Sequence, residues 1–101
     1  MNSPLTGLRS EIDEVDRQLL VLLARRFEVV TRVAAVKSGA GLPARIGERI
    51  IEVIGSREEA GLALGMPSGA AAAIWSAIVE QSCLYEERLM QLAAVERQLS
   101  T

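Results

Sequence analysis

Two basic side chains occupy positions that an apolar helix face would normally fill. Along residues 8–37 apolar residues recur at intervals of three or four, and Arg26 and Lys37 fall on the same stripe. In a helix these two cations lie on one face, about 16 Å apart. Because a buried cation without a partner is costly and no acid lies between them on the stripe, we predict a site for a small polyanionic ligand. The alternative is that each cation extends to solvent or pairs with an acid such as Glu28 or Glu48.

Two further arginines and two polar residues near the C-terminus are weaker candidates. Arg9 and Arg49 could bind an anion, although each could equally be a solvated surface residue. Arg9 lies about 25 Å from Arg26 along one helix, so it could join the same small site only from a partner chain. Ser82 and Glu86 are four residues apart at the edge of an apolar face, where they could add a hydroxyl and a carboxyl group. Taken singly, either would more often have a capping or surface role.

The composition excludes several kinds of site and partner. The chain has no histidine and a single cysteine, so it lacks the usual general base, and we predict neither a metal site nor a cofactor. The net charge is −2 and basic residues are interleaved with acidic ones, which argues against a nucleic-acid partner. No apolar run is long enough to cross a membrane. One cysteine cannot form an internal disulfide and no charged-then-apolar leader opens the sequence, so we predict a cytoplasmic protein.

The elements that would position these residues are all helical. Half of the residues are apolar but only 3% are aromatic, and alanine and aliphatic side chains predominate, which is typical of an all-α fold. Ser3 and Pro4 form a helix start, Gly39 to Pro43 form a break, and Gly65 ends the second helix. We therefore expect one domain over residues 1–101, with helices at about 4–38, 45–62 and 67–99. Trp75 and Cys83 are expected in the core or at an interface.

The length of the first helix predicts an oligomer. A helix over residues 4–38 would be about 50 Å long, whereas a compact domain of this size has a radius of gyration of about 13 Å. Its apolar stripe needs a second chain to cover it, so we predict an intertwined homodimer. A simple antiparallel coiled-coil pair is the alternative.

The order of residues along the chain resembles the all-helical chorismate mutases. The match covers residues 5 to about 92, and its residues are Leu8, Arg9, Ile12, Asp13, Asp16, Leu19, Leu20, Leu22, Leu23, Arg26, Lys37, Pro43 and Arg49. The resemblance implies three helices per chain and an interlocked dimer with two buried sites. It also implies a dicarboxylate substrate and a [3,3]-sigmatropic rearrangement, which needs no base, nucleophile or metal.

The resemblance assigns a role to each candidate. It implies that Arg9 arrives from the partner chain to hold one carboxylate and that Arg26 holds the other. Lys37 would point at the ether oxygen of the substrate, and we expect it to supply most of the stabilisation of the charge that develops there. Arg49 would line the pocket, and Ser82 falls where the family often has a serine near the ligand.

Glu86 falls where many members of this family have a glutamine beside the ether oxygen. An ionised carboxylate cannot donate a hydrogen bond and would repel negative charge on that oxygen. Glu86 would therefore have to be protonated. We expect activity to fall as rising pH ionises it, and Glu86→Gln to remove that dependence.

Two positions depart from the family pattern and leave the substrate open. Ile46 and Ile50 stand where the mutases often carry acids, so the ring hydroxyl lacks its usual acceptor unless Glu48 replaces it through a local shift of the helix. The substrate could be chorismate, as in aromatic amino acid biosynthesis, or 4-amino-4-deoxychorismate, as in antibiotic biosynthesis, and the segment SCLYEERLM resembles the amino-substrate group. The alternatives are an isochorismate-pyruvate lyase and a non-catalytic helical dimerisation or regulatory module.

Overall fold

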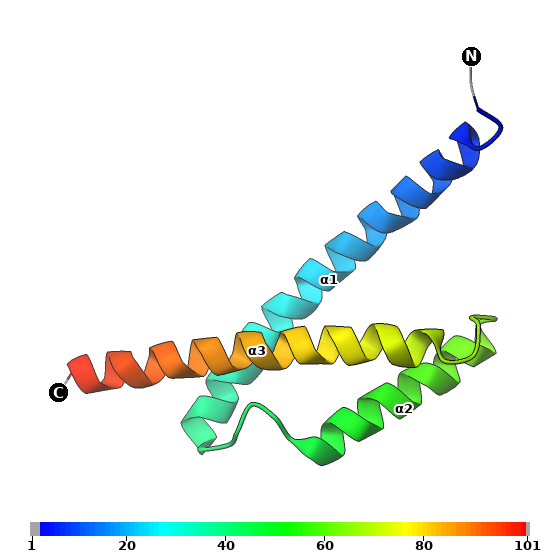
Figure 1. The fold of residues 1–101 in the computed structure, drawn as a ribbon. Helices are drawn as coiled ribbons and strands as arrows, with labels where there is room; N and C mark the ends of the chain where they lie inside the picture. The colour runs from blue at the N-terminus through cyan, green and yellow to red at the C-terminus, as the bar shows by residue number, and fades with distance from the viewer. Residues whose placement is uncertain (1–2, 101) are drawn as a thin grey trace.

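The computed structural model describes residues 3–100 and consists of three helices (Figure 1). These are α1 (Thr6–Ala40), α2 (Gly47–Ala63) and α3 (Ala70–Leu99). Residues 3–100 contain no strand, so the predicted all-α class and the number and order of the helices are confirmed. None of the helices in this range is both long and apolar enough to cross a membrane.

The ends of α1 differ from the prediction by about two residues. Ser3 Oγ accepts a hydrogen bond from the Leu5 amide at 3.2 Å in the turn before the helix. The prediction that Ser3 caps the helix is wrong, because α1 begins at Thr6 and its N-cap residue is Leu5, without a side-chain cap. The prediction that Gly39 begins the break is wrong, because α1 continues through Gly39 to Ala40. Gly41 instead ends the helix in the left-handed conformation, at φ 69°, which glycine adopts at little steric cost.

Two glycines and one glutamate shape the connection from α2 to α3. Gly65 and Gly69 both have positive φ, 87° and 83°, so α3 begins at Ala70 rather than at the predicted Pro67. The Glu58 carboxylate on α2 accepts hydrogen bonds from the backbone amides of Gly69 at 2.8 Å and Ala72 at 3.1 Å. A carboxylate at this position satisfies free amides and complements the helix dipole, so Glu58 joins α2 to the start of α3.

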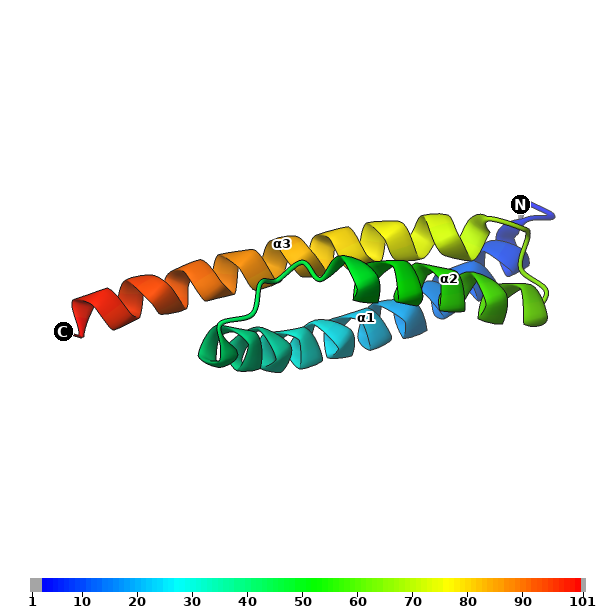
Figure 2. The same cartoon turned by 90° about the horizontal axis from the view of Figure 1, so that it is seen from below.

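The helix α3 is the common support for the other two helices. Both α2 and the second half of α1 pack on α3, whereas α1 and α2 do not pack on each other (Figures 1 and 2). The core cluster consists of Val53, Val79 and Cys83, with Ile50 and Trp75 packed against it. Cys83 and Trp75 therefore contribute to the core, as predicted. The space between α1 and α2 is left for a cavity.

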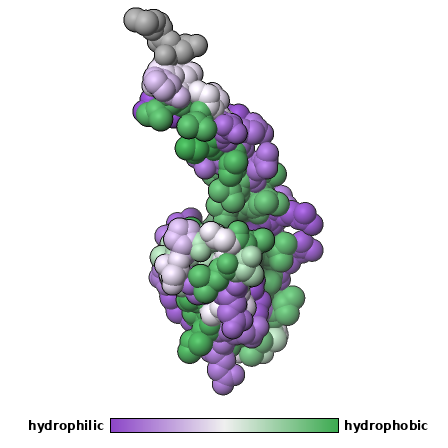
Figure 3. All heavy atoms as spheres, turned by 90° about the vertical axis from the view of Figure 1, so that its right-hand side faces the viewer, coloured by the Kyte–Doolittle hydropathy of each residue, from purple (hydrophilic) through white to green (hydrophobic). Residues whose placement is uncertain are grey.

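The first half of α1 extends beyond the rest of the chain, and we call residues 6–22 the α1 arm (Figures 1 and 3). Its stripe residues Leu8, Ile12, Val15 and Leu19 are all more than half exposed. The radius of gyration is 18.1 Å, against about 13 Å for a compact chain of this length. The chain alone leaves this apolar stripe uncovered, which is the situation that motivated the predicted dimer.

Candidate active site

A cavity of about 290 Å³ lies between the three helices and collects most of the predicted site residues. Its wall combines aliphatic side chains with four cations and one carboxylate. From α1 it takes Arg26, Val29, Val30, Val33 and Lys37; from the following loop Ala44 and Ile46; from α2 Arg49, Ile50, Val53 and Arg57; and from α3 Val79, Ser82, Cys83 and Glu86.

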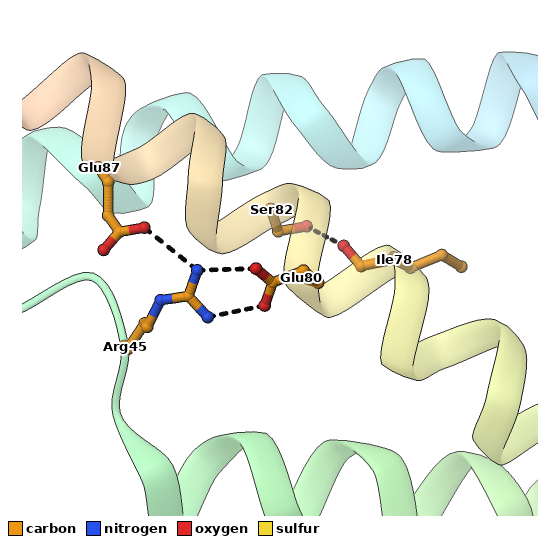
Figure 4. Close-up of polar contacts among 5 residues, drawn as sticks. All are labelled: Arg45, Ile78, Glu80, Ser82 and Glu87. Carbon is orange, nitrogen blue, oxygen red and sulfur yellow. Dashed lines mark hydrogen bonds and ion pairs between the residues drawn. The ribbon is translucent and has the colours of Figure 1, made fainter.

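Arg26 enters the cavity from α1 and meets a neutral partner on α3. Its Nη1 donates a hydrogen bond to Ser82 Oγ at 2.5 Å, and Ser82 Oγ in turn donates to the Ile78 carbonyl at 2.8 Å (Figure 4). Burial lowers the pKa of Arg26, and the nearby charges of Arg57 and Arg49 lower it further. A guanidinium in these surroundings lacks a full counter-charge, so an anion in the cavity would be bound favourably.

Lys37 forms a close ion pair with the buried carboxyl group of Glu86. Its Nζ donates to the Ala44 carbonyl at 2.6 Å and lies 2.7 Å from Glu86 Oε1, with side-chain exposures of 15% for Lys37 and 7% for Glu86. The contact with Oε1 is a close ion pair without the alignment of a hydrogen bond, since that oxygen has no hydrogen-bond partner among residues 3–100. The anticipated alternative partners Glu28 and Glu48 do not pair with Lys37. An ammonium has three donors, so Lys37 retains donor capacity toward a ligand.

Ile46, just before α2, and the first residues of α2 occupy one wall of the cavity and its rim. Ile46 and Ile50 present apolar surface to the cavity, while Arg49 lies at the exposed rim and pairs with Glu52 at 2.7 Å. Glu48 is exposed and does not line the cavity, so the helix shows no local shift that would bring its carboxylate inside.

Arg9 is the predicted site residue that lies farthest from the cavity. It is exposed on the α1 arm and does not line the cavity of its own chain. This position agrees with the sequence argument that Arg9 could act only in the site of a partner chain.

Sequence reasoning missed Arg57, which lines the same cavity. Ile46, Ile50, Val53 and Arg57 are spaced four, three and four residues apart and form one stripe, which starts at the residue before α2 and continues along the helix; we call it the α2 stripe. A cation on an apolar stripe was the signal that identified Arg26 and Lys37, and the same signal would have identified Arg57.

A second missed feature is the anchoring of the loop between α1 and α2. Arg45 binds Glu80 through two hydrogen bonds of 2.7 and 2.9 Å and reaches Glu87 at 3.2 Å (Figure 4). These bonds raise the pKa of Arg45, and the bond from Arg45 lowers the pKa of Glu80. These three hydrogen bonds, which we call the Arg45 clasp, hold the loop on α3. The Ala44 carbonyl of the same loop accepts the hydrogen bond from Lys37. Sequence spacing gave no signal for the clasp because its members are 35 and 42 residues apart.

The arrangement is suited to binding a dianion and to stabilising negative charge. Four cations face one carboxylate in a partly apolar enclosure, where electrostatic interactions are stronger than in water. Within residues 3–100 no group of three or more His, Cys, Asp and Glu side chains is placed to hold a metal ion.

Comparison with known proteins points to one family. A family model described as chorismate mutase type II matches residues 8–87. The chain is 48% identical over 67 residues to the T-protein of Enterobacter agglomerans and 45% identical over 62 residues to the T-protein of Haemophilus influenzae. It is 41% identical over 49 residues to a protein of Aquifex aeolicus named bifunctional chorismate mutase/prephenate dehydratase.

These matches cover only part of each sequence. They include 66%, 57% and 48% of this chain but 18%, 16% and 14% of the three relatives, so the chain spans less than a fifth of the length of each. No solved structure matches the chain. The family model nevertheless extends over most of the chain and over every residue of the cavity. The chain therefore belongs to the chorismate mutase type II family.

Proposed function

We propose that the chain is a chorismate mutase domain that converts chorismate to prephenate by a [3,3]-sigmatropic rearrangement. The observation that carries the proposal is the placement of Arg26, Lys37 and Glu86 in one cavity. Four cations line this cavity but only one carboxylate does, so the cations are not neutralised by the cavity wall. Chorismate is a dicarboxylate, so it supplies the two negative charges that such a cavity would bind. Family membership and the name of the Aquifex aeolicus relative support the same reaction.

The proposed mechanism relies on binding and charge stabilisation. One carbon–oxygen bond breaks and one carbon–carbon bond forms within the substrate, and no proton or electron leaves it. Arg26 holds a carboxylate, which favours the compact conformer in which the reacting carbons approach each other. Lys37, fixed by the Ala44 carbonyl and Glu86, donates to the ether oxygen as negative charge grows there. Glu86 orients the Lys37 ammonium through their ion pair.

The proposed active unit is a homodimer. The exposed stripe of the α1 arm would be buried against a second copy, and each large aliphatic side chain buried there stabilises association by roughly 1.5–3 kcal/mol. In this arrangement Arg9 on the arm completes the site of the other protomer. Arg49 and Ser82 complete the contacts within one chain.

The charge of the cavity favours the hydroxyl substrate over the amino one. Four cations line the cavity and its single carboxylate already faces Lys37, so a protonated amino group on the ring would meet repulsion. We therefore propose chorismate rather than 4-amino-4-deoxychorismate.

Product analysis by mass spectrometry tests the proposal. The purified protein is given chorismate, isochorismate and 4-amino-4-deoxychorismate in separate reactions. Prephenate from chorismate is the expected result. Pyruvate from isochorismate would identify a lyase instead, turnover of only the amino substrate would overturn the choice of ring substituent, and no product from any of the three would favour a non-catalytic helical module.

A further inference from the structure

Arg57 is the cavity cation whose role the proposed mechanism leaves open. It is half-buried on the last turn of the α2 stripe, and its Nη1 donates to the neighbouring Ser56 Oγ at 3.0 Å. Lys37 has Glu86 and Arg49 has Glu52, but Arg57 forms no ion pair within residues 3–100. A half-buried guanidinium that lines an anion-binding cavity and touches only a hydroxyl has unused hydrogen-bonding capacity.

Arg57 lies at the same end of the cavity as Arg26. Lys37, near the end of α1, contacts Ala44, which lies just before α2 begins. The chain directions of α1 and α2 are opposite, so residues before Lys37 on α1 and residues after Gly47 on α2 lie toward the same end of the cavity (Figure 1). Arg26 is about 16 Å back along α1, and Arg57 is about 15 Å forward along α2 from Gly47. Among the charges that lower the pKa of Arg26, Arg57 contributes the most. The two guanidinium groups therefore line the same part of the cavity, and within residues 3–100 the hydrogen-bond partner of each is a serine hydroxyl.

We infer that Arg57 and Arg26 form a two-guanidinium site that binds one carboxylate of the substrate from both sides. A carboxylate placed between them would remove their mutual repulsion and accept hydrogen bonds from both planar groups. The identity of the substrate rests on the proposed function, whereas the need for an anion between these side chains follows from the cavity itself.

The inferred site also has a mechanical consequence. The helices α1 and α2 each pack on α3 but not on each other, so no direct packing joins these two walls of the cavity. A carboxylate bound by Arg26 on α1 and Arg57 on α2 would connect them. Binding should therefore raise the melting temperature of the protein even without turnover.

The first test measures anion binding in the absence of a reaction. Thermal unfolding of the full chain is followed with malonate and, at equal ionic strength, with sodium chloride. We expect malonate to raise the melting temperature of the wild type and of Arg32→Gln, which removes a cation from the exposed face of α1 outside the cavity. Arg57→Gln should lose most of that rise, and Arg57→Lys should keep part of it. An undiminished rise in Arg57→Gln would overturn the inference.

The second test identifies the group that Arg57 binds. The two monomethyl esters of chorismate are compared with chorismate itself as substrates. Arg57→Gln should lower kcat/KM for chorismate by about 10- to 100-fold, mainly through KM, as expected for a charge-assisted hydrogen bond that forms already in the ground state. The wild type should discriminate strongly against the ester at the bound carboxylate, and the variant should lose that discrimination. Equal losses on all three substrates would show a merely structural role and contradict the inference.

A double variant adds an internal check. Because both guanidiniums would hold one carboxylate, Arg57→Gln should cost less in an Arg26→Gln background than alone. If the wild type binds malonate but does not convert chorismate, the proposed function fails while the anion site stands. If it converts chorismate and Arg57→Gln matches Arg32→Gln in both tests, the proposed function stands while the anion site fails.

Discussion

The two halves of α1 have the same apolar spacing but different surroundings. In the α1 arm, Leu8 and Leu19 are 57% and 51% exposed, whereas Val30 and Ala34 in the second half, where α1 packs on α3, are 8% and 2% exposed. Both halves are continuous in one helix, so neither helix propensity nor periodicity separates them. The difference shows that an apolar stripe predicts burial of that helix face. It does not predict whether the same chain or a second chain covers the face.

The second half also contains the cations that the arm's stripe lacks. Arg26 and Lys37 replace apolar residues where α1 borders the cavity, and both meet polar groups from α3 or the loop. The arm's stripe remains purely aliphatic, which suits a dry interface with another chain. Apart from Arg9, the proposed site residues thus lie where this chain covers its own helix, and the proposed assembly surface lies where it does not.

The largest expected effect comes from placing a charge on the arm. Leu19 is half exposed in the single chain, where a glutamate would remain solvated, but Leu19→Glu would bury an unpaired carboxylate twice in the proposed dimer. We expect the dissociation constant of the dimer to rise by about 10³-fold or more, and activity to fall with it because Arg9 is lost from the other site.

Sedimentation velocity and kinetics measure these two effects. Ile51→Glu is the matched control, because Ile51 is 75% exposed on α2 and lies outside both the arm and the cavity. A Leu19→Glu protein that remains dimeric, or an active monomer, would contradict the proposed role of the arm.

In the second half, removing a cavity cation should reduce turnover without changing assembly. Lys37→Gln should lower kcat by about 10²- to 10³-fold, as observed when a donor to developing negative charge is removed. The dimer and its helical content should be retained, as measured by sedimentation and circular dichroism. Near-normal kcat in a folded Lys37→Gln dimer would exclude Lys37 from the chemical step.

A smaller effect should distinguish the roles of Glu86 and Lys37. Glu86 faces the Lys37 ammonium at 2.7 Å and is itself buried, so it holds in place the group that would donate to the ether oxygen. Glu86→Gln keeps the shape of this side chain but removes its charge, so we expect kcat to fall by less than in Lys37→Gln, because the ammonium remains. Steady-state kinetics of the two variants measure the difference, and a loss in Glu86→Gln as large as that in Lys37→Gln would contradict these separate roles.

The close packing of α2 against the start of α3 can be tested by adding a methyl group at a glycine of α2. A Cβ at Gly61 would lie 2.7 Å from Ala71 Cβ and 3.1 Å from Met66 Sδ, whereas Gly55 on the same helix has open space around it. Gly61→Ala should lower the free energy of unfolding by about 1–3 kcal/mol through overpacking. Gly55→Ala should raise it by about 0.5–1 kcal/mol through helix propensity. Chemical denaturation measures both, and equal shifts would show that α2 and α3 can separate at little cost.

The smallest expected effect concerns the Arg45 clasp on the surface. Arg45 lowers the pKa of Glu80 below its ordinary value of 4.5, so the stabilisation is present above about pH 4.5 and is lost as the pH falls through the folded-state value. The wild type should therefore melt slightly above Glu80→Gln at neutral pH, and the difference should vanish in acid. Both residues are exposed, so the difference should also shrink in high salt. A difference that persists in acid would show that Glu80 stabilises the fold by other means.

Much of the site could be predicted from local spacing. Arg26 and Lys37 were identified because a cation on an apolar stripe is a conflict within one helix, and the same conflict at Arg57 was overlooked. The partners of these cations could not be predicted in this way. Ser82 reaches Arg26 and Glu86 reaches Lys37 only because α3 packs along α1, and those residues are 56 and 49 positions apart in the chain.

Periodicity and glycine placement act over a few residues, so the three helices, their order and the faces that must be covered could be predicted locally. The same reasoning predicted that the apolar stripe of the α1 arm needs a partner. Packing in three dimensions was needed to show that α3 supports both other helices, that Glu86 rather than Glu28 or Glu48 meets Lys37, and that Arg57 lines the same cavity as Arg26. These contacts join side chains that are far apart in the sequence, so the spacing of residues within one helix cannot predict them.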